Sequence, residues 1–249
     1  MEKTADRRGA MILAAAIVAA GIAAGGFFAG RGFYMSRMAD RVVTVKGLAE
    51  QDVRADLAIW TVRFVATSDS LEAAQAKIEK DQGLVLTFLR EKGLAEEDMA
   101  VGRTEVIDLL AQQYRGEGAS QSRYIVKGAV GVRSGKVDLL DATSRATGEL
   151  VRRGVVLEQE YAEGGTGPKY IFTRLNDVKP AMIVEATANA RRAAEQFAKD
   201  SKSGLGKIKR AYQGMFMILP RDGNESVSES RYIDKKVRVV STIDYYLVR

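Results

Sequence analysis

The stretch of this sequence that comes nearest to a chemical motif is GVRSGKV, residues 131–137. A loop between a strand and a helix holds nucleotide phosphates when it has the pattern G-x-x-x-x-G-K-[ST]. Its backbone N–H groups then surround the phosphates, and the last hydroxyl binds magnesium. Here Val130 stands at the first glycine position and Val137 at the hydroxyl position. We therefore interpret the stretch as a strand-to-helix turn.

Acidic residues are the other side chains that could do chemistry, as an acid and base pair. Glu96, Glu97 and Asp98 form a cluster after a predicted helix, which is typical of a solvated corner. Asp108 and Asp138 stand beside apolar runs and are more typical of turns or helix caps. A carboxylate-based enzyme is the weakest of three functional hypotheses, and it requires two acids to converge in an apolar pocket.

The 249 residues include no cysteine and no histidine. This composition excludes disulfides, thiolate nucleophiles, zinc sites with Cys or His ligands, and catalytic pairs that depend on histidine. We expect no enzymatic activity, no catalytic residue, no cofactor and no bound metal.

The formal net charge is +6. Half of this excess lies in residues 1–41, around an apolar run, where basic residues commonly meet lipid headgroups. The rest of the chain is nearly balanced and has no basic stripe with interleaved aromatic residues. We therefore expect no nucleic-acid partner.

The apolar run covers residues 10–30 and contains no charged residue. As a helix it would be about 31 Å long, which is enough to cross a bilayer core. A cleaved signal peptide is the alternative, because Ala-Ala-Gly could supply a cleavage site. We favour a retained transmembrane anchor, since the run continues through Phe27 and Phe28 to Arg31. Basic residues stand on both sides, so their distribution does not orient it.

Two small-xxx-small spacings lie within this run, Gly21 to Gly25 and Gly26 to Gly30. In lipid such spacings let helix backbones approach closely. They also occur by chance in segments rich in alanine and glycine. We take these four glycines as a candidate packing surface between anchors.

The rest of the chain alternates between strand and helix patterns. Helical periodicity predicts helices over residues 71–93, 136–154 and 178–204, the first ended by Gly93 and the last with Asn176 or Asp177 near its cap and Gly204 at its end. Strand patterns cover residues 41–49, 54–67, 101–114, 123–133, 155–163, 169–175, 207–220 and 231–248.

Two of these patterns also predict buried faces. In the strand 54–67 we expect Ala58, Trp60, Val62, Phe64 and Ala66 on one face, with Trp60 as a core anchor. In the first helix we expect the stripe Leu71, Ala74, Ile78, Val85 and Leu89. The elements predict an α+β fold with antiparallel sheets packed against helices. Their order within residues 51–163 is ferredoxin-like.

Residues 42–249 resemble the SIMPL-domain family of bacterial exported proteins. A V-x-V-x-G strand leads through a polar turn to a strand that begins with an aspartate, matched here by Val43, Val45, Gly47, Asp56 and Ala58, before a helix from Ser70. A late helix runs into a second motif, matched by Ala198, Leu205, Gly206 and Ile208, and VVSTIDYYLV is similar to the closing strand.

This resemblance implies a periplasmic or envelope-associated protein without established catalytic residues, in a family where one branch forms homo-oligomeric rings. We therefore expect a short tail at residues 1–9, an anchor at 10–30, a linker at 31–41 and a SIMPL-like domain at 42–249. The leading hypothesis is a single-pass inner-membrane protein whose periplasmic part assembles with itself into a ring. The alternative is a binding module for a small envelope ligand or client protein, with loops 115–122 and 220–230 at its rim.

Overall fold

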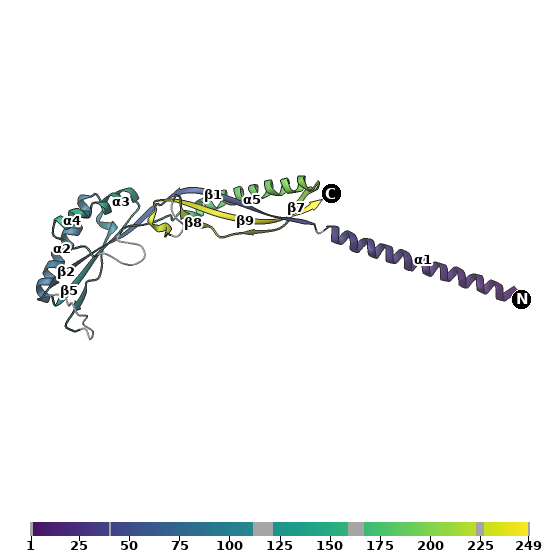
Figure 1. Ribbon diagram of the computed structural model, residues 1–249, viewed down its shortest axis with the longest axis horizontal. Coiled ribbons are helices and arrows are strands. Elements are labelled where there is room, and N and C mark those ends of the chain that lie inside the picture. Colours follow the sequence, from purple (N-terminus) through teal and green to yellow (C-terminus); the bar gives the residue numbers. More distant parts are fainter. Residues whose placement is uncertain (1, 40, 112–121, 159–166, 223–226, 249) are drawn as a thin grey trace. The chain divides into compact units, whose positions relative to one another are not determined.

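The computed structural model describes the chain apart from residues 1, 40, 112–121, 159–166, 223–226 and 249 (Figure 1). The chain divides into two compact units. Unit 1 comprises residues 1–49, 183–215 and 239–249, and unit 2 comprises residues 50–182 and 216–238. The expected domain of residues 42–249 contributes to both units, because one helix and two strands continue from one unit into the other.

Unit 2 contains an antiparallel sheet in which the strand order is β3-β5-β2-β6 and β4 also pairs with β5. The first and third strands of the ferredoxin-like order, β2 and β5, are therefore central, as that arrangement requires. The strands are β2 (Leu57–Ser68), β3 (Met99–Val101), β4 (Glu105–Asp108), β5 (Tyr124–Ser134) and β6 (Lys169–Ile171). The predicted order placed its fourth strand at residues 155–163, but the described residues there form only a bridge from Leu157 to Phe64. Strand β6, which lies after residue 163, takes the fourth position beside β2.

Three helices accompany this sheet: α2 (Leu71–Glu91), α3 (Val137–Arg145) and α4 (Gly148–Arg152). Helices α2 and α3 pack against β2. The alternating residues predicted for the inner face of β2 are all buried, and Trp60 is one of them. The predicted stripe of α2 is buried except for Leu71, which is exposed because it is the first residue of the helix. Ser70 caps the start of α2, and Gly93 follows its end with a φ of +89°.

Unit 1 contains most of a second antiparallel sheet, with strand order β1-β9-β7. Its strands are β1 (Val42–Arg54), β7 (Gly204–Gln213) and β9 (Asp234–Val248), and β8 (Met217–Pro220) pairs with the part of β9 that belongs to unit 2. Helix α5 (Leu175–Asp200) packs on β1 and β9 through a small core that includes Val45, Ala190, Ala194 and Tyr245. Both sheets are antiparallel and packed with helices, so the predicted α+β class is confirmed.

The boundaries of several predicted elements were wrong. Helix α5 begins at Leu175, before the predicted caps, because a hydrogen bond of 3.1 Å from the Asp177 N–H to the Arg174 carbonyl closes a first turn ahead of Pro180. It ends at Asp200, and Gly204 starts β7 instead of capping the helix. The predicted helix 136–154 is broken into α3 and α4, the strand 101–114 into β3 and β4, and the strand 207–220 into β7 and β8. Of the predicted strand 155–163, residues 155–158 form only one isolated bridge, between Leu157 and Phe64. Residues 159–163 lie outside the described residues.

Helix α1 (Glu2–Ala39) contains a 24-residue segment, Met11–Tyr34, that is long and apolar enough to cross a membrane. Its mean hydropathy is 2.2 and its side chains are exposed. By length and composition it fits a membrane span or a signal sequence, and it contains most of the anchor predicted at residues 10–30.

Candidate functional site

The cluster at the end of α2 lies on the surface, as predicted. Glu96 and Glu97 are exposed on a short 3₁₀ helix, η1 (Glu96–Asp98). The carboxylate of Asp98 accepts a hydrogen bond of 2.8 Å from the hydroxyl of Ser134, at the end of β5. This contact fixes the turn between β5 and α3, so Asp98 has a structural role here.

The residues of GVRSGKV form the strand-to-helix turn that we predicted. The stretch begins in β5, and Val137 is the first residue of α3, buried in the core of unit 2. Asp138 lies in the first turn of α3 and forms an ion pair with Arg54. Asp108 accepts the N–H of Leu110, at 2.9 Å, and therefore closes a turn. Hydrogen bonds from Arg123 are the largest cause that lowers the pKa of Asp108.

Two carboxylates are buried within the described part of the chain, and each has a cationic partner. The carboxylate of Asp81 in α2 accepts a hydrogen bond of 2.8 Å from the ammonium group of Lys77, which lies one turn earlier in the helix. Asp244 in β9 accepts the Thr44 hydroxyl at 2.7 Å and is paired with Arg210, whose Nη2 lies 3.0 Å away. The hydrogen bond from Thr44 is the largest cause that lowers the pKa of Asp244, and Arg210 adds to it.

Asp81 and Asp244 belong to different compact units. The hypothesis of a carboxylate-based enzyme required two acids in one apolar pocket, whereas each of these two buried acids is an ion-pair partner within its own unit. No group of three or more His, Cys, Asp or Glu side chains that could hold a metal ion occurs among the described residues.

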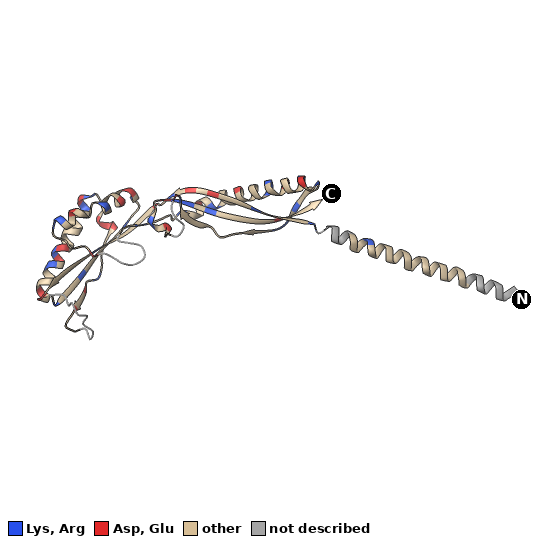
Figure 2. Cartoon of the chain, viewed as in Figure 1, with Lys and Arg blue, Asp and Glu red and all other residues tan. Residues whose placement is uncertain are grey.

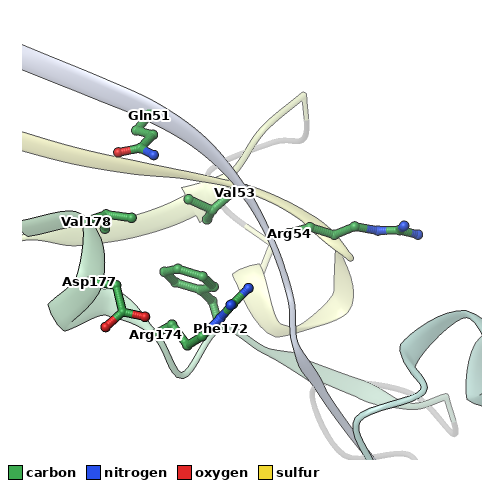
Figure 3. A pocket seen from close by; sticks show the side chains of 7 residues that line it. All are labelled: Gln51, Val53, Arg54, Phe172, Arg174, Asp177 and Val178. Atoms are coloured by element: carbon green, nitrogen blue, oxygen red, sulfur yellow. The ribbon is translucent and has the colours of Figure 1, made fainter.

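A pocket of about 310 Å³ opens in unit 2 beside the start of α5 (Figure 3). Its lining comes from the end of β1, the segment after β6 and the first turn of α5. The ring of Phe172 and the side chains of Val53 and Val178 face a common space in Figure 3, whereas Arg54 points away. The complete lining is Gln51, Val53, Arg54, Phe172, Arg174, Asp177 and Val178. This volume is at the small end of ligand pockets, and an apolar centre with a few polar groups is typical of them.

Asp56 fixes the segment that carries Phe172 and Arg174 into this pocket. Its carboxylate accepts the backbone N–H of Thr173 at 2.7 Å and the Thr173 hydroxyl at 2.8 Å. Arg174 adds an ion pair, with its Nε 3.3 Å from the same carboxylate. Burial raises the pKa of Asp56, but the hydrogen bonds from Thr173, its own backbone N–H and the charge of Arg174 together lower it further, so the net pKa is lowered. Asp56 is the aspartate of the resembled motif, and this contact gives it a physical role.

Sequence reasoning missed this pocket. The predicted binding loops lie elsewhere, and residues 115–121 and 223–226 are outside the described part of the chain. The sequence pattern did indicate that Phe172 is buried. Tyr170 and Phe172 alternate with exposed neighbours, as in a strand with one buried face, and both are buried. The other lining residues come from separate segments, so no local pattern could have joined them.

A buried lysine was also missed. Lys235 of β9 is fully buried, and its ammonium group donates to the backbone carbonyl of Glu229 at 2.5 Å and to the Glu229 carboxylate at 3.3 Å. Burial is the largest influence on its pKa and lowers it, while Glu229 opposes that effect. The strand pattern could have predicted this burial, because Lys235 lies on the same face of β9 as Val237 and Val239, both of which are buried.

Strand β7 forms an edge of its sheet. It pairs with β9 on one side, and the described residues provide no partner on the other. Large apolar side chains on and just after it are exposed, namely Ile208, Tyr212 and Met215 at 44%, 58% and 85%. An edge strand with exposed apolar side chains is a site where another chain can add a strand.

The four glycines predicted to pack between anchors, Gly21, Gly25, Gly26 and Gly30, all lie in α1 and are exposed. A Cβ atom at any of them would meet nothing within 4 Å. These positions are therefore open to contact with a second helix.

Residues 43–240 match the model of the SIMPL family, which is described as a protein of unknown function (DUF541). The match covers most of the chain and includes β2, all of β1 but its first residue, and the first part of β9. No curated protein matches the chain.

Proposed function

Because this chain belongs to the SIMPL family, we propose that it is a membrane-anchored protein of the bacterial envelope that assembles with itself into a ring. The observation that carries the proposal is the open edge of β7 with its exposed Ile208 and Tyr212. In this function the protein is a structural or scaffolding component.

Helix α1 supplies the anchor in this proposal. Its segment Met11–Tyr34 would extend about 36 Å at 1.5 Å per residue, against a hydrocarbon core of about 30 Å. The anchor crosses the inner membrane once, and the domain that follows it lies in the periplasm. Sequencing the N-terminus of protein purified from membranes tests this step. A mature chain that begins after residue 30 would contradict it.

The sheet of unit 1 supports head-to-tail assembly. Strand β1 lies at one edge and β7 at the other, so the two edges are different surfaces. Pairing β7 of one copy with β1 of the next uses two different surfaces, and such a contact forms a ring when its rotation closes. Each anchor attached to the ring then binds the membrane as an intramolecular event, which strengthens the attachment.

The mass of the full chain in detergent tests the assembly. We expect an oligomer, and a monomer would contradict the proposal. The same measurement on residues 41–249 shows whether α1 is needed. Ile208→Lys combined with Tyr212→Lys should reduce the mass to that of a monomer, because two charges would be placed at the proposed contact. Val184→Lys is the matched control, since Val184 is an exposed apolar residue of α5 and lies outside β7.

The pocket beside α5 favours a second candidate function, the binding of a small envelope ligand. Its apolar centre and its polar groups Gln51, Arg174 and Asp177 fit a small, mainly apolar molecule with a polar end. A panel of such compounds in a thermal-shift measurement tests this function, because a ligand of the folded state raises the melting temperature.

A variant pair makes that test specific. Val178→Trp should fill the pocket and abolish any shift, whereas Val184→Trp, on an exposed site of the same helix, should leave it unchanged. An equal shift in both variants would place the ligand elsewhere.

A further inference from the structure

Several chain segments meet at one end of unit 1. The N–H of Leu247 donates to the carbonyl of Arg41 at 2.8 Å, so the start of β1 lies beside the end of β9. Gly204 pairs with Val248, so the start of β7 lies there too. Helix α5 ends at Asp200, just before β7, and Figure 1 shows its end close to the C-terminus. We call this region the proximal end of unit 1.

The proximal end carries exposed basic side chains, namely Arg41, Lys199, Lys202 and Lys207. Two exposed acids of the described residues accompany them, Glu195, one turn before Lys199, and Asp200, which accepts a hydrogen bond of 2.9 Å from Gln196. None of the four basic residues forms an ion pair with another described residue. Figure 2 shows that both signs of charge occur along α5, so this excess of positive charge is local.

Chain connectivity keeps this end close to the end of the apolar segment. The segment ends at Tyr34, and α1 continues to Ala39, so one residue separates the helix from Arg41. Five helical residues and two extended ones span at most about 15 Å. The headgroup layer is about 5–8 Å deep on each side of the core, and screening extends about 8 Å further at physiological salt. The proximal end therefore lies within electrostatic reach of the membrane surface once α1 spans the bilayer.

We propose that the proximal end of unit 1, through Arg41, Lys199, Lys202 and Lys207, binds the anionic headgroups of the membrane that α1 crosses. This inference rests on the anchoring step of the proposed function. The partner is an anionic phospholipid surface, because clustered basic residues beside a membrane helix are attracted by its negative potential. Contact at this end restrains unit 1 next to the bilayer.

The absence of cysteine allows single fluorophores to be placed on the full chain. A label at Ser201→Cys reports the proximal end, one at Ala76→Cys reports the exposed side of α2, and one at Ala23→Cys reports the apolar segment. The full chain is reconstituted into phosphatidylcholine bilayers with and without phosphatidylglycerol. Spin-labelled lipids that quench at the headgroup or in the acyl chains then measure the location of each label.

We expect headgroup quenching at position 201 to increase severalfold when phosphatidylglycerol is present and to fall at high salt. The label at position 76 should not respond. Replacing Lys199, Lys202 and Lys207 by Gln should abolish the increase. Replacing three exposed basic residues of unit 2 by Gln is the matched control and should leave the increase unchanged; they are Lys80, Arg90 and Arg152.

The label at position 23 separates the two possible failures. If acyl-chain quenchers reach position 23 but quenching at position 201 is the same in both bilayers, the lipid contact is wrong and the anchor stands. If acyl-chain quenchers do not reach position 23, the anchor is wrong, and the lipid contact fails with it. An increase that survives the replacement of Lys199, Lys202 and Lys207 would also overturn the assignment.

Discussion

Gly47 of β1 lies directly against the backbone of Ala186 in α5. A Cβ atom at residue 47 would be 1.9 Å from the carbonyl oxygen of Ala186, a distance that no atom can occupy without displacing the helix. Ala186, Ala190, Ala194 and Ala198 repeat every fourth residue and are all buried. Small side chains on the helix and no side chain on the strand therefore let the two backbones approach closely. This contact gives a physical reason for the glycine of the V-x-V-x-G pattern.

Gly47→Ala should lower the free energy of unfolding by about 3 kcal/mol, because overpacking forces the helix away from the sheet. Denaturant unfolding measures this change. Gly83→Ala is the control, since Gly83 lies within α2 and a Cβ there meets nothing within 4 Å. That substitution should stabilise the protein by about 0.5–1 kcal/mol. Equal stabilities of Gly47→Ala and the unaltered protein would contradict the packing argument.

Asp244→Asn should destabilise the protein at neutral pH, because it removes the charge that accepts from Thr44 and Arg210. Folding lowers the pKa of Asp244 below its ordinary value of 3.8. The contribution is therefore complete above about 3.8 and is lost as the pH falls through the lowered pKa. Melting temperatures of both proteins across the acid range should accordingly converge at low pH. A difference that does not depend on pH would show that the carboxylate charge is not the cause.

The unaltered protein should gain stability from Lys235 as the pH rises in the alkaline range. A lysine with a lowered pKa binds fewer protons when folded than when unfolded, so stability rises between the lowered pKa and 10.5. Lys235→Met should remove this rise and be neutral or stabilising at neutral pH, because a buried charge is replaced by an apolar chain of similar volume. Urea unfolding at several pH values measures both effects. Strong destabilisation by Lys235→Met would contradict this account.

Glu229→Gln tests the partner of that lysine. It leaves the Lys235 ammonium group buried without a carboxylate, and it should cost about 1–3 kcal/mol at neutral pH. In the background of Lys235→Met the same substitution should cost much less, because no charge is left without a partner. Equal costs in both backgrounds would mean that the two residues are not coupled.

Gly21→Leu combined with Gly25→Leu should loosen contacts between anchors, because close helix packing in lipid requires small residues. Cross-linking between single cysteines at Ala24 in the reconstituted protein should fall, while the mass of the assembly stays unchanged. Gly32→Leu is the matched control, since it lies in α1 outside both glycine pairs. Unchanged cross-linking would assign the glycine spacings to chance.

Local patterns predicted much of unit 2. Alternation in β2 identified its buried face, including Trp60 and Phe64, because strand geometry places every second side chain on the same side. Helical periodicity together with Ser70 and Gly93 identified α2, since these signals act within a few residues. The prediction failed at Leu175 and Gly204, where a tight turn and a strand replaced the expected caps.

The candidate site lay beyond such patterns. Val53, Phe172 and Val178 meet in one pocket only after β1, the segment following β6 and the start of α5 come together. No pattern among their sequence neighbours distinguishes Gln51 and Asp177 from polar residues that are simply exposed to solvent.

By itself, the sequence of this protein determined its strand and helix periods, its apolar N-terminal segment and the absence of histidine and cysteine chemistry. These properties depend on residue types and on near neighbours. Only the tertiary structure decided that β1, α5 and β9 are shared between two compact units, that Gly47 must lack a side chain, and that Thr44, Arg210 and Asp244 form one cluster. The physical reason is that such contacts depend on which distant strands pair and in what register, and this outcome is a property of the whole packed chain.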